Sequence, residues 1–298
     1  MTIRHLLIFI SVVENKTMSA AAEKLYLTQP TVSQVIKELE EHYQTPLFDR
    51  LSKKLFLTEA GQQLLFYAKQ VVSMFDETEN RMLDSTMRNR LRIGATLTVG
   101  SSVMIDIVHS LNELYPRVEP ELYVYNTSII EEKLLHSELD IALVEGRISN
   151  PLIVVEPVIA DKLIFACTKS HRLAGKKTVS LEDLRNEIFV LREQGSGTRK
   201  QFEQSMSSAE IPYYVSWNCN TIVSILKAVV AGFGSTVISE KLIDGEWKEK
   251  LSISQLEGDN WNREFSIAYH KNKRISDYML VFMKICGLDV KAENGDIC

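Results

Sequence analysis

Two short helices are encoded by residues 18–41, MSAAAEKLYLTQPTVSQVIKELEE. The first is rich in alanine, the strongest helix former, and Ser19 is its expected N-cap. The second begins near Pro30, which suits the first helical position, after a cap provided by Thr28 or Gln29. The turn between them has the length that is typical of a helix-turn-helix motif.

The second helix has two different faces. Its apolar residues repeat at helical spacing and predict one buried face. The opposite face carries hydrogen-bonding side chains that suit base edges or phosphates in a DNA major groove, although an ordinary solvated helix face is the alternative. These candidate DNA-binding residues are Gln29, Pro30, Thr31, Ser33, Gln34 and Lys37.

A basic hairpin is predicted for residues 50–57, where Arg50, Lys53 and Lys54 cluster. Such a hairpin beside a recognition helix is a wing, which reaches phosphates or the minor groove. Residues 1–58 hold seven Lys and Arg against six Asp and Glu, so this expected domain is hardly basic. Tight DNA binding should therefore depend on the placement of a few cations and on oligomerisation.

An ordered series of short motifs runs through this segment. The motifs are Phe9, Ala21-Ala22-Glu23, Leu25, Thr28-Gln29-Pro30, Val32-Ser33, Ile36, Leu39-Glu40, Leu47-Phe48-Asp49-Arg50 and Leu57-Thr58-Glu59-Ala60-Gly61. The series resembles the winged helix-turn-helix of LysR-type transcriptional regulators. The resemblance implies a sequence-specific transcription regulator whose partner is double-stranded promoter DNA. Many members carry an arginine at the position of Gln34, so base preference does not transfer to this chain. The apolar run near the N-terminus is short and is interrupted by Glu14, Asn15 and Lys16, which predicts a cytoplasmic protein.

A long helix is predicted for residues 59–89, with Thr58 as its cap. Apolar and small residues recur at steps of four and three, a coiled-coil-like spacing, and a long core helix is the alternative. The residues in this series are Leu64, Ala68, Val71, Phe75, Thr78 and Met82. The resemblance implies a linker helix that joins two copies in a dimer, usually within a homotetramer, and it admits RNA polymerase as a further partner.

Strands and helices alternate in residues 90–298. Strands are expected at 91–95, 121–125, 139–144, 163–167, 187–191 and 213–217, and helices at 103–115, 129–137, 198–207 and 221–231. This α/β pattern predicts parallel sheets with helices on both faces. The resemblance implies a periplasmic-binding-protein-like effector domain of two α/β subdomains, with a small effector in the cleft between them. Subdomain I would hold residues 91–161 plus 268–298, and subdomain II residues 162–267.

Four places in this second half suit a ligand, because open parallel sheets bind ligands at the carboxyl ends of strands, beside helix N-termini. Hydroxyls, backbone N–H groups and helix dipoles there favour an anion, and Arg192 could pair with it alongside Arg199. The alternatives are plain helix caps for the hydroxyls and a surface ion pair for Arg199. The candidate effector-binding residues are Thr96, Thr98, Val99, Gly100, Ser101, Glu145, Gly195, Ser196, Gly197, Thr198, Arg199, Asn220 and Thr221.

Other function classes find little support in the sequence. The six histidines and four cysteines are scattered without HExxH or CxxC spacing, so neither a metal site nor a cofactor is expected. Motifs for a nucleophile elbow, a Walker A loop or a dinucleotide-binding turn are missing, which argues against an enzyme. A solute-binding protein is the other alternative, but the N-terminal module and the lack of a signal peptide or an apolar span disfavour it.

Overall fold

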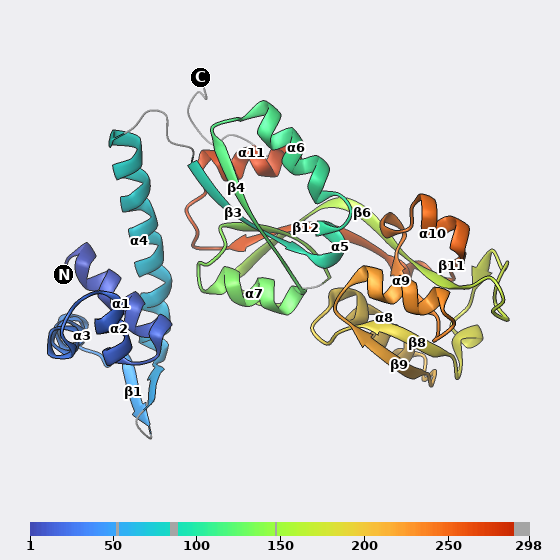
Figure 1. Cartoon of the computed structure of the whole chain (residues 1–298), viewed down its shortest axis with the longest axis horizontal. Coiled ribbons are helices and arrows are strands. Elements are labelled where there is room, and N and C mark those ends of the chain that lie inside the picture. The colour runs from blue at the N-terminus through green and yellow to red at the C-terminus, as the bar shows by residue number, and fades with distance from the viewer. Residues whose placement is uncertain (52–53, 84–88, 147, 289–298) are drawn as a thin grey trace. The chain divides into compact units, whose positions relative to one another are not determined.

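The computed structural model describes residues 1–51, 54–83, 89–146 and 148–288. The chain divides into two compact units, of which the first holds Met1–Asn89 and the second holds nearly all of the chain from Arg90 onward (Figure 1). Among the described residues, no helix is both long enough and apolar enough to cross a membrane.

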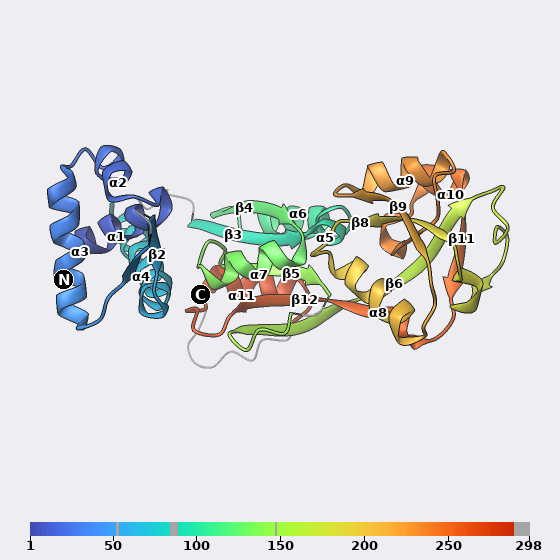
Figure 2. The same ribbon diagram turned by 90° about the horizontal axis from the view of Figure 1, so that it is seen from below.

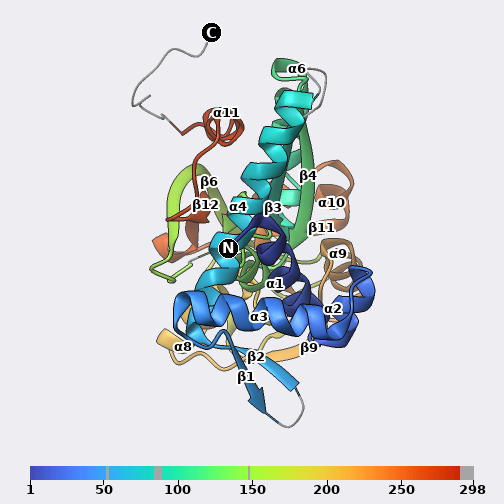
Figure 3. The ribbon, with the colours of Figure 1, turned by 90° about the vertical axis from the view of Figure 1, so that its left-hand side faces the viewer.

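The first unit is a winged helix-turn-helix followed by a long helix, as the sequence predicted. Figure 3 shows α3 lying across the other short helices and the hairpin projecting beyond them. Apolar side chains from all four helices and from the first strand form one core around the fully buried Phe9. The elements are α1 (Ile3–Asn15), α2 (Met18–Lys24), α3 (Gln29–Tyr43), β1 (Phe48–Leu51), β2 (Lys54–Leu57) and α4 (Glu59–Leu83).

Threonine side chains cap the N-termini of α2, α3 and α4. Thr17, not the expected Ser19, caps α2 by accepting a hydrogen bond from Ala20 N at 3.1 Å. Thr28 caps α3, so of the two candidates the residue before Gln29 is the cap. Thr58 accepts from Gly61 N at 3.0 Å and donates to Pro46 O at 2.8 Å, which fixes the start of α4 as predicted.

The second unit contains two lobes, each with its own core. The first lobe holds β3 (Asn89–Thr96), α5 (Leu97–Gly100), α6 (Met104–Leu114), β4 (Val118–Tyr125), α7 (Thr127–Leu135), β5 (Ile141–Glu145) and α11 (Asp277–Ile285). Strands β3 and β5 pair in parallel. Helices α6 and α11 cover one face of this sheet and α7 covers the other (Figures 1 and 2).

The second lobe is one continuous segment of chain that lies beyond the first (Figure 2). Its strands are β7 (Thr178–Val179), β8 (Ile188–Arg192), β9 (Tyr214–Cys219), β10 (Thr236–Ser239) and β11 (Leu251–Leu256). Its helices are α8 (Gly197–Ser208), α9 (Ile222–Val230) and α10 (Gly245–Lys250), with short 3-10 turns at Glu182–Leu184, Glu240–Leu242 and Asp259–Trp261. Strands β8 and β9 pair in parallel.

Two long antiparallel strands pass between the lobes, β6 (Ile153–Thr168) outward and β12 (Asn262–His270) back. Strand β6 also pairs antiparallel with β10 and β11, so the prediction of parallel sheets is correct only for pairs such as β3 with β5, and the main sheet is mixed. The predicted strand 163–167 is only the outer part of β6. Phe265 and Ile267 pack in the core of the first lobe, so the return to it comes earlier than residue 268.

Candidate functional site

The exposed face of α3 is the candidate nucleic-acid interface of the first unit. Gln29, Pro30, Thr31, Gln34 and Lys37 are exposed on it and Ser33 is half-buried. The helix is held from the opposite side by apolar residues that are at most 1% exposed, namely Val32, Ile36 and Leu39. The structure therefore brings the six predicted side chains of this helix to one accessible surface.

Carboxylates on the same helix already bond to two of these side chains. Gln34 Nε2 donates to Glu38 Oε1 at 3.0 Å. His5 Nε2 lies 3.2 Å from Glu38 Oε2, and these two contacts hold the pKa of Glu38 below its ordinary value. Lys37 Nζ lies 3.5 Å from Glu41 Oε1. The face is thus close to neutral, so its hydrogen-bonding groups contribute more to recognition than its net charge does.

The predicted wing exists as the hairpin of β1 and β2. Its register pairs Leu51 with Lys54 and Arg50 with Leu55. Two of the three predicted wing cations, Arg50 and Lys54, therefore lie on its strands. The third, Lys53, lies outside the described residues.

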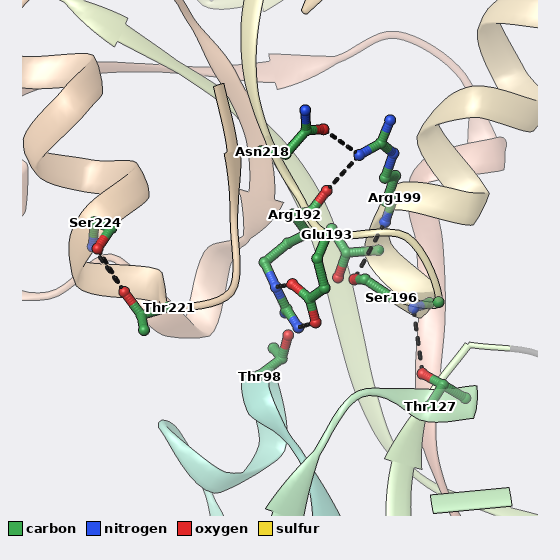
Figure 4. Close-up of polar contacts among 12 residues, drawn as sticks. Thr98, Thr127, Arg192, Glu193, Ser196, Arg199, Asn218, Thr221 and Ser224 are labelled. Atoms are coloured by element: carbon green, nitrogen blue, oxygen red, sulfur yellow. Dashed lines mark hydrogen bonds and ion pairs between the residues drawn. The ribbon is translucent and has the colours of Figure 1, made fainter. Parts of the chain in front are cut away.

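In the second unit, the two lobes meet at the N-termini of α7 and α8. Thr127 Oγ1 donates to Glu145 O at 3.1 Å and accepts from Gly197 N at 3.2 Å, as Figure 4 shows for the second bond. A Cβ atom on Gly197 would lie 2.7 Å from Glu145 O and 3.0 Å from Gly146 Cα, so this close approach requires glycine. A pocket of about 140 Å³ opens here, lined among others by Thr127, Ser128 and Gly195.

The carboxyl group of Glu145 lies buried behind this junction, at the end of β5. Thr98 Oγ1 donates to Glu145 Oε1 at 3.1 Å, and Thr96 Oγ1 accepts from Glu145 N at 3.1 Å. Glu145 Oε2 has no hydrogen-bond partner among the described residues. Burial raises the pKa of Glu145, while the charges of Arg263 and Arg192 act in the opposite direction.

Two buried arginines from the second lobe and the crossing strand complete the site. Arg192, at the end of β8, donates from Nε and Nη2 to Glu193 at 2.9 and 3.0 Å, and Figure 4 shows Thr98 pointing toward this pair. Arg263, on β12, donates to Asp161 Oδ2 at 2.6 Å and to Thr198 Oγ1 at 2.9 Å. Arg192 Nη1 and Arg263 Nη2 lack partners in the part of the chain that the structure describes.

Arg199 and the hydroxyl residues around it have partners within their own lobe. Arg199 donates to Glu203 at 2.7 Å. It also donates to Arg192 O at 2.9 Å and to Asn218 at 2.5 Å, and these two bonds are drawn in Figure 4. Ser196 accepts from Arg199 N as the cap of α8. These bonds favour a structural role for Arg199, and its predicted contact with an anion stays a prediction.

The remaining predicted residues separate into two groups. Gly195, Gly197 and Thr198 lie at the lobe junction, with Thr98 and Glu145 facing it. The others have structural roles or lie away from the junction. Thr96 supports the backbone of Glu145, Val99 is part of the core of the first lobe, and Gly100 packs on Val124. Ser101 is exposed after α5, and Asn220 and Thr221 precede α9, which Thr221 caps.

Four residues of the site were not predicted from the sequence: Thr127, Ser128, Asp161 and Arg263. Thr127 and Ser128 follow β4 at the start of α7, the same strand-to-helix arrangement that indicated the other candidates, so the pattern could have found them. Nothing local in the sequence singles out Arg263, because its partners Asp161 and Thr198 lie 102 and 65 positions away.

Comparison with known proteins identifies the family. The profile described as "Bacterial regulatory helix-turn-helix protein, lysR family" matches residues 3–62, and "LysR substrate binding domain" matches residues 84–288. The chain belongs to the LysR family. It is a DNA-binding transcription regulator with an effector-binding domain, not an enzyme.

Its LysR-family relatives match along most of their length. The HTH-type transcriptional regulator CysL of Bacillus subtilis is 31% identical over 281 residues, which cover 91% of this chain and 94% of that protein. Among solved structures, CbnR complexed with its target DNA has a TM-score of 0.64 at 20% identity, covering 96% of this chain and 98% of that one. The regulatory domain of Synechocystis PCC6803 CcmR in complex with 2-PG has a TM-score of 0.63 at 23% identity, covering 67% and 96%.

Proposed function

We propose that a small anionic metabolite binds at the junction of the two lobes and that its binding controls how the winged helix-turn-helix engages promoter DNA. The observation that carries this proposal is a pair of guanidinium nitrogens, Arg192 Nη1 and Arg263 Nη2, that have no partner among the residues that the structure describes. Their side chains are 3% and 6% exposed. Buried donors of this kind are costly unless a ligand completes them. The CcmR regulatory domain, which shares the fold, was solved with 2-PG, and this supports a small-molecule ligand here.

A thermal-shift screen of the full chain against sulfate, phosphate, acetylserine and organic acids tests the binding step. An anion at about 100 times its Kd adds about 2.7 kcal/mol to the free energy of unfolding. This corresponds to a rise in the melting temperature of about 5–11 °C for a unit of this size. Arg192→Gln removes a charge-assisted hydrogen bond worth about 1.5–3 kcal/mol and should lower affinity by about 10- to 150-fold. Arg185→Gln is the matched control, because Arg185 pairs with Glu182 on the surface.

The outcome is decided by comparing the two variants. If no anion in the panel shifts the melting of the wild-type protein, or if Arg192→Gln and Arg185→Gln respond equally to an anion that does, the site is wrong. Regulation of DNA binding by the anion needs a second measurement. The same anion should change the affinity or the footprint of the protein on duplex DNA from upstream of its own gene. An anion that binds without changing either would contradict the regulatory part.

We also propose that α4 joins two copies in a homodimer, within the tetramer that the family resemblance implies. Ala68 is buried in the core of the first unit, but Val71 and Phe75 of the same series are 43% and 45% exposed. Phe75→Glu should shift the mass measured by light scattering toward the monomer, whereas Ser73→Glu, on the opposite face of the helix, should not. An unchanged mass for Phe75→Glu would contradict this interface.

A further inference from the structure

Three buried polar atoms around the lobe junction lack hydrogen-bond partners within the described ranges: Glu145 Oε2, Arg192 Nη1 and Arg263 Nη2. They come from the ends of β5 and β8 and from β12, so both lobes and the crossing strand contribute. Both arginines act electrostatically on Glu145. A buried polar group without a partner is unfavourable, so one carboxyl oxygen and two guanidinium nitrogens in this state indicate a place where a bound molecule supplies the missing partners.

The charges of the neighbouring groups cancel in pairs. Arg192 is paired with Glu193 through two hydrogen bonds, and Arg263 is paired with Asp161, whose side chain is 0% exposed. The charge state of Glu145 therefore decides the net charge of this group of five. If Glu145 is ionised the group is negative and repels an anion, and if it is protonated the group is neutral and offers three donors.

The surroundings of Glu145 favour its protonated form. Glu145 is 1% exposed. Among the described residues, Thr98 donates the hydrogen bond that its side chain accepts, and this bond is made to Oε1. An ionised carboxylate in a buried position usually accepts several hydrogen bonds. Burial correspondingly raises its pKa, against the opposing influence of Arg263 and Arg192.

We propose that Glu145 binds the effector in its protonated form and donates a hydrogen bond from Oε2 to an oxygen atom of the effector, so that the cleft selects small oxyanions and retains a proton when it binds them. This inference rests on the proposed anion site. Arg192 Nη1 and Arg263 Nη2 contact the negative oxygens, and the carboxyl O–H contacts another oxygen of the same molecule. An α-amino acid is disfavoured, because its ammonium group would need an ionised carboxylate.

Proton balance makes the proposal measurable. Where Glu145 is ionised in the free protein, one proton enters from solvent with each anion, because the bound anion stabilises the protonated carboxyl group. Affinity is then constant below the pKa of Glu145 in the free protein. It falls by up to about tenfold per pH unit above that pKa, until the pKa of the complex is reached.

The test uses the full chain with sulfate and nitrate, whose charges stay constant across about pH 5.5–9.5. Isothermal titration calorimetry in two buffers of different ionisation enthalpy should show proton uptake that rises with pH toward one proton per anion bound. Glu145→Gln keeps the shape and a donor, so it should retain within about threefold the affinity that the wild type has at the acid end, without pH dependence. Glu182→Gln, on the surface of the second lobe, should keep the wild-type profile.

Each result decides between the two proposals. If neither sulfate nor nitrate binds the wild type at any pH, the anion site itself fails and this inference fails with it. If an anion binds with a flat pH profile and no proton uptake while Glu145→Gln changes its affinity by more than about threefold, or if Glu145→Gln abolishes binding, only the role of Glu145 is overturned. A pH dependence that persists unchanged in Glu145→Gln assigns the proton to another group and likewise overturns it.

Discussion

Replacing Asp161 by alanine should strongly destabilise the second unit. Asp161 sits where β6 crosses between the lobes, directly opposite Arg263 in the register of β12, and its side chain is 0% exposed. It accepts from Arg263 Nε at 2.6 Å and from Ser239 Oγ at 2.5 Å. Asp161→Ala leaves the guanidinium charge of Arg263 buried, with the neutral hydroxyl of Thr198 as its remaining acceptor among the described residues.

Breaking a buried pair by removing one partner costs about 3–5 kcal/mol of the free energy of unfolding. For a unit of this size each kcal/mol lowers the melting temperature by about 2–4 °C, so the expected loss is about 6–20 °C. All three tryptophans, Trp217, Trp247 and Trp261, lie in the second lobe. Thermal unfolding followed by tryptophan fluorescence therefore reports this lobe alone.

The matched control is Glu182→Ala, which breaks an exposed pair with Arg185 and should cost less than about 1 kcal/mol. The double variant Asp161→Ala with Arg263→Met should recover part of the loss, because it also removes the buried charge. If Asp161→Ala lowers the melting temperature no more than Glu182→Ala does, the Asp161–Arg263 pair does not stabilise the crossing as argued.

Three further predictions concern the lobe junction and α3. Gly197→Ala should prevent the close approach to Gly146 and weaken anion binding, measured by calorimetry, at least tenfold. Gly245→Ala is the control, because this glycine is also at a helix start but has open space around it. Equal effects of the two substitutions would count against the junction as the binding site. Lys37→Ala should reduce the slope of log K against log salt for duplex DNA by about one per bound copy, and an unchanged slope would rule out a phosphate contact. Thr28→Ala should cost about 1 kcal/mol, seen as faster amide exchange in the first turn of α3; unchanged exchange would contradict the cap.

The first unit could be predicted closely because its signals are local. The helix periodicity, the Pro30 start and the hairpin all lie within about sixty consecutive residues, and α3 presents the expected side chains. The same local reasoning misplaced the cap of α2 by two residues, because Ser19 and Thr17 are both good caps and only the backbone path decides between them.

The effector site was predictable only in part. Strand ends and the glycine loop indicated Thr98, Glu145 and Gly197, which the structure places at or beside the junction of the two lobes. Arg199 looked available because its local motif does not show Asn218, 19 positions away, which accepts one of its hydrogen bonds. Arg263 could not be found, since pairing of β6 with β12 brings it to the site from a strand that the periodicity did not reveal.

The two crossing strands also determine the order in which this chain can fold during synthesis. Lys162 and Asn262 are paired neighbours, so the second lobe begins and ends at the same place and its residues emerge as one block. The first lobe instead waits for β12 and α11, which are synthesised last and complete its core. A nascent chain that has emerged from the ribosome as far as residue 262 would therefore hold a complete second lobe beside an unfinished first lobe, whose exposed strand edge at β5 makes it the aggregation-prone part of the nascent protein.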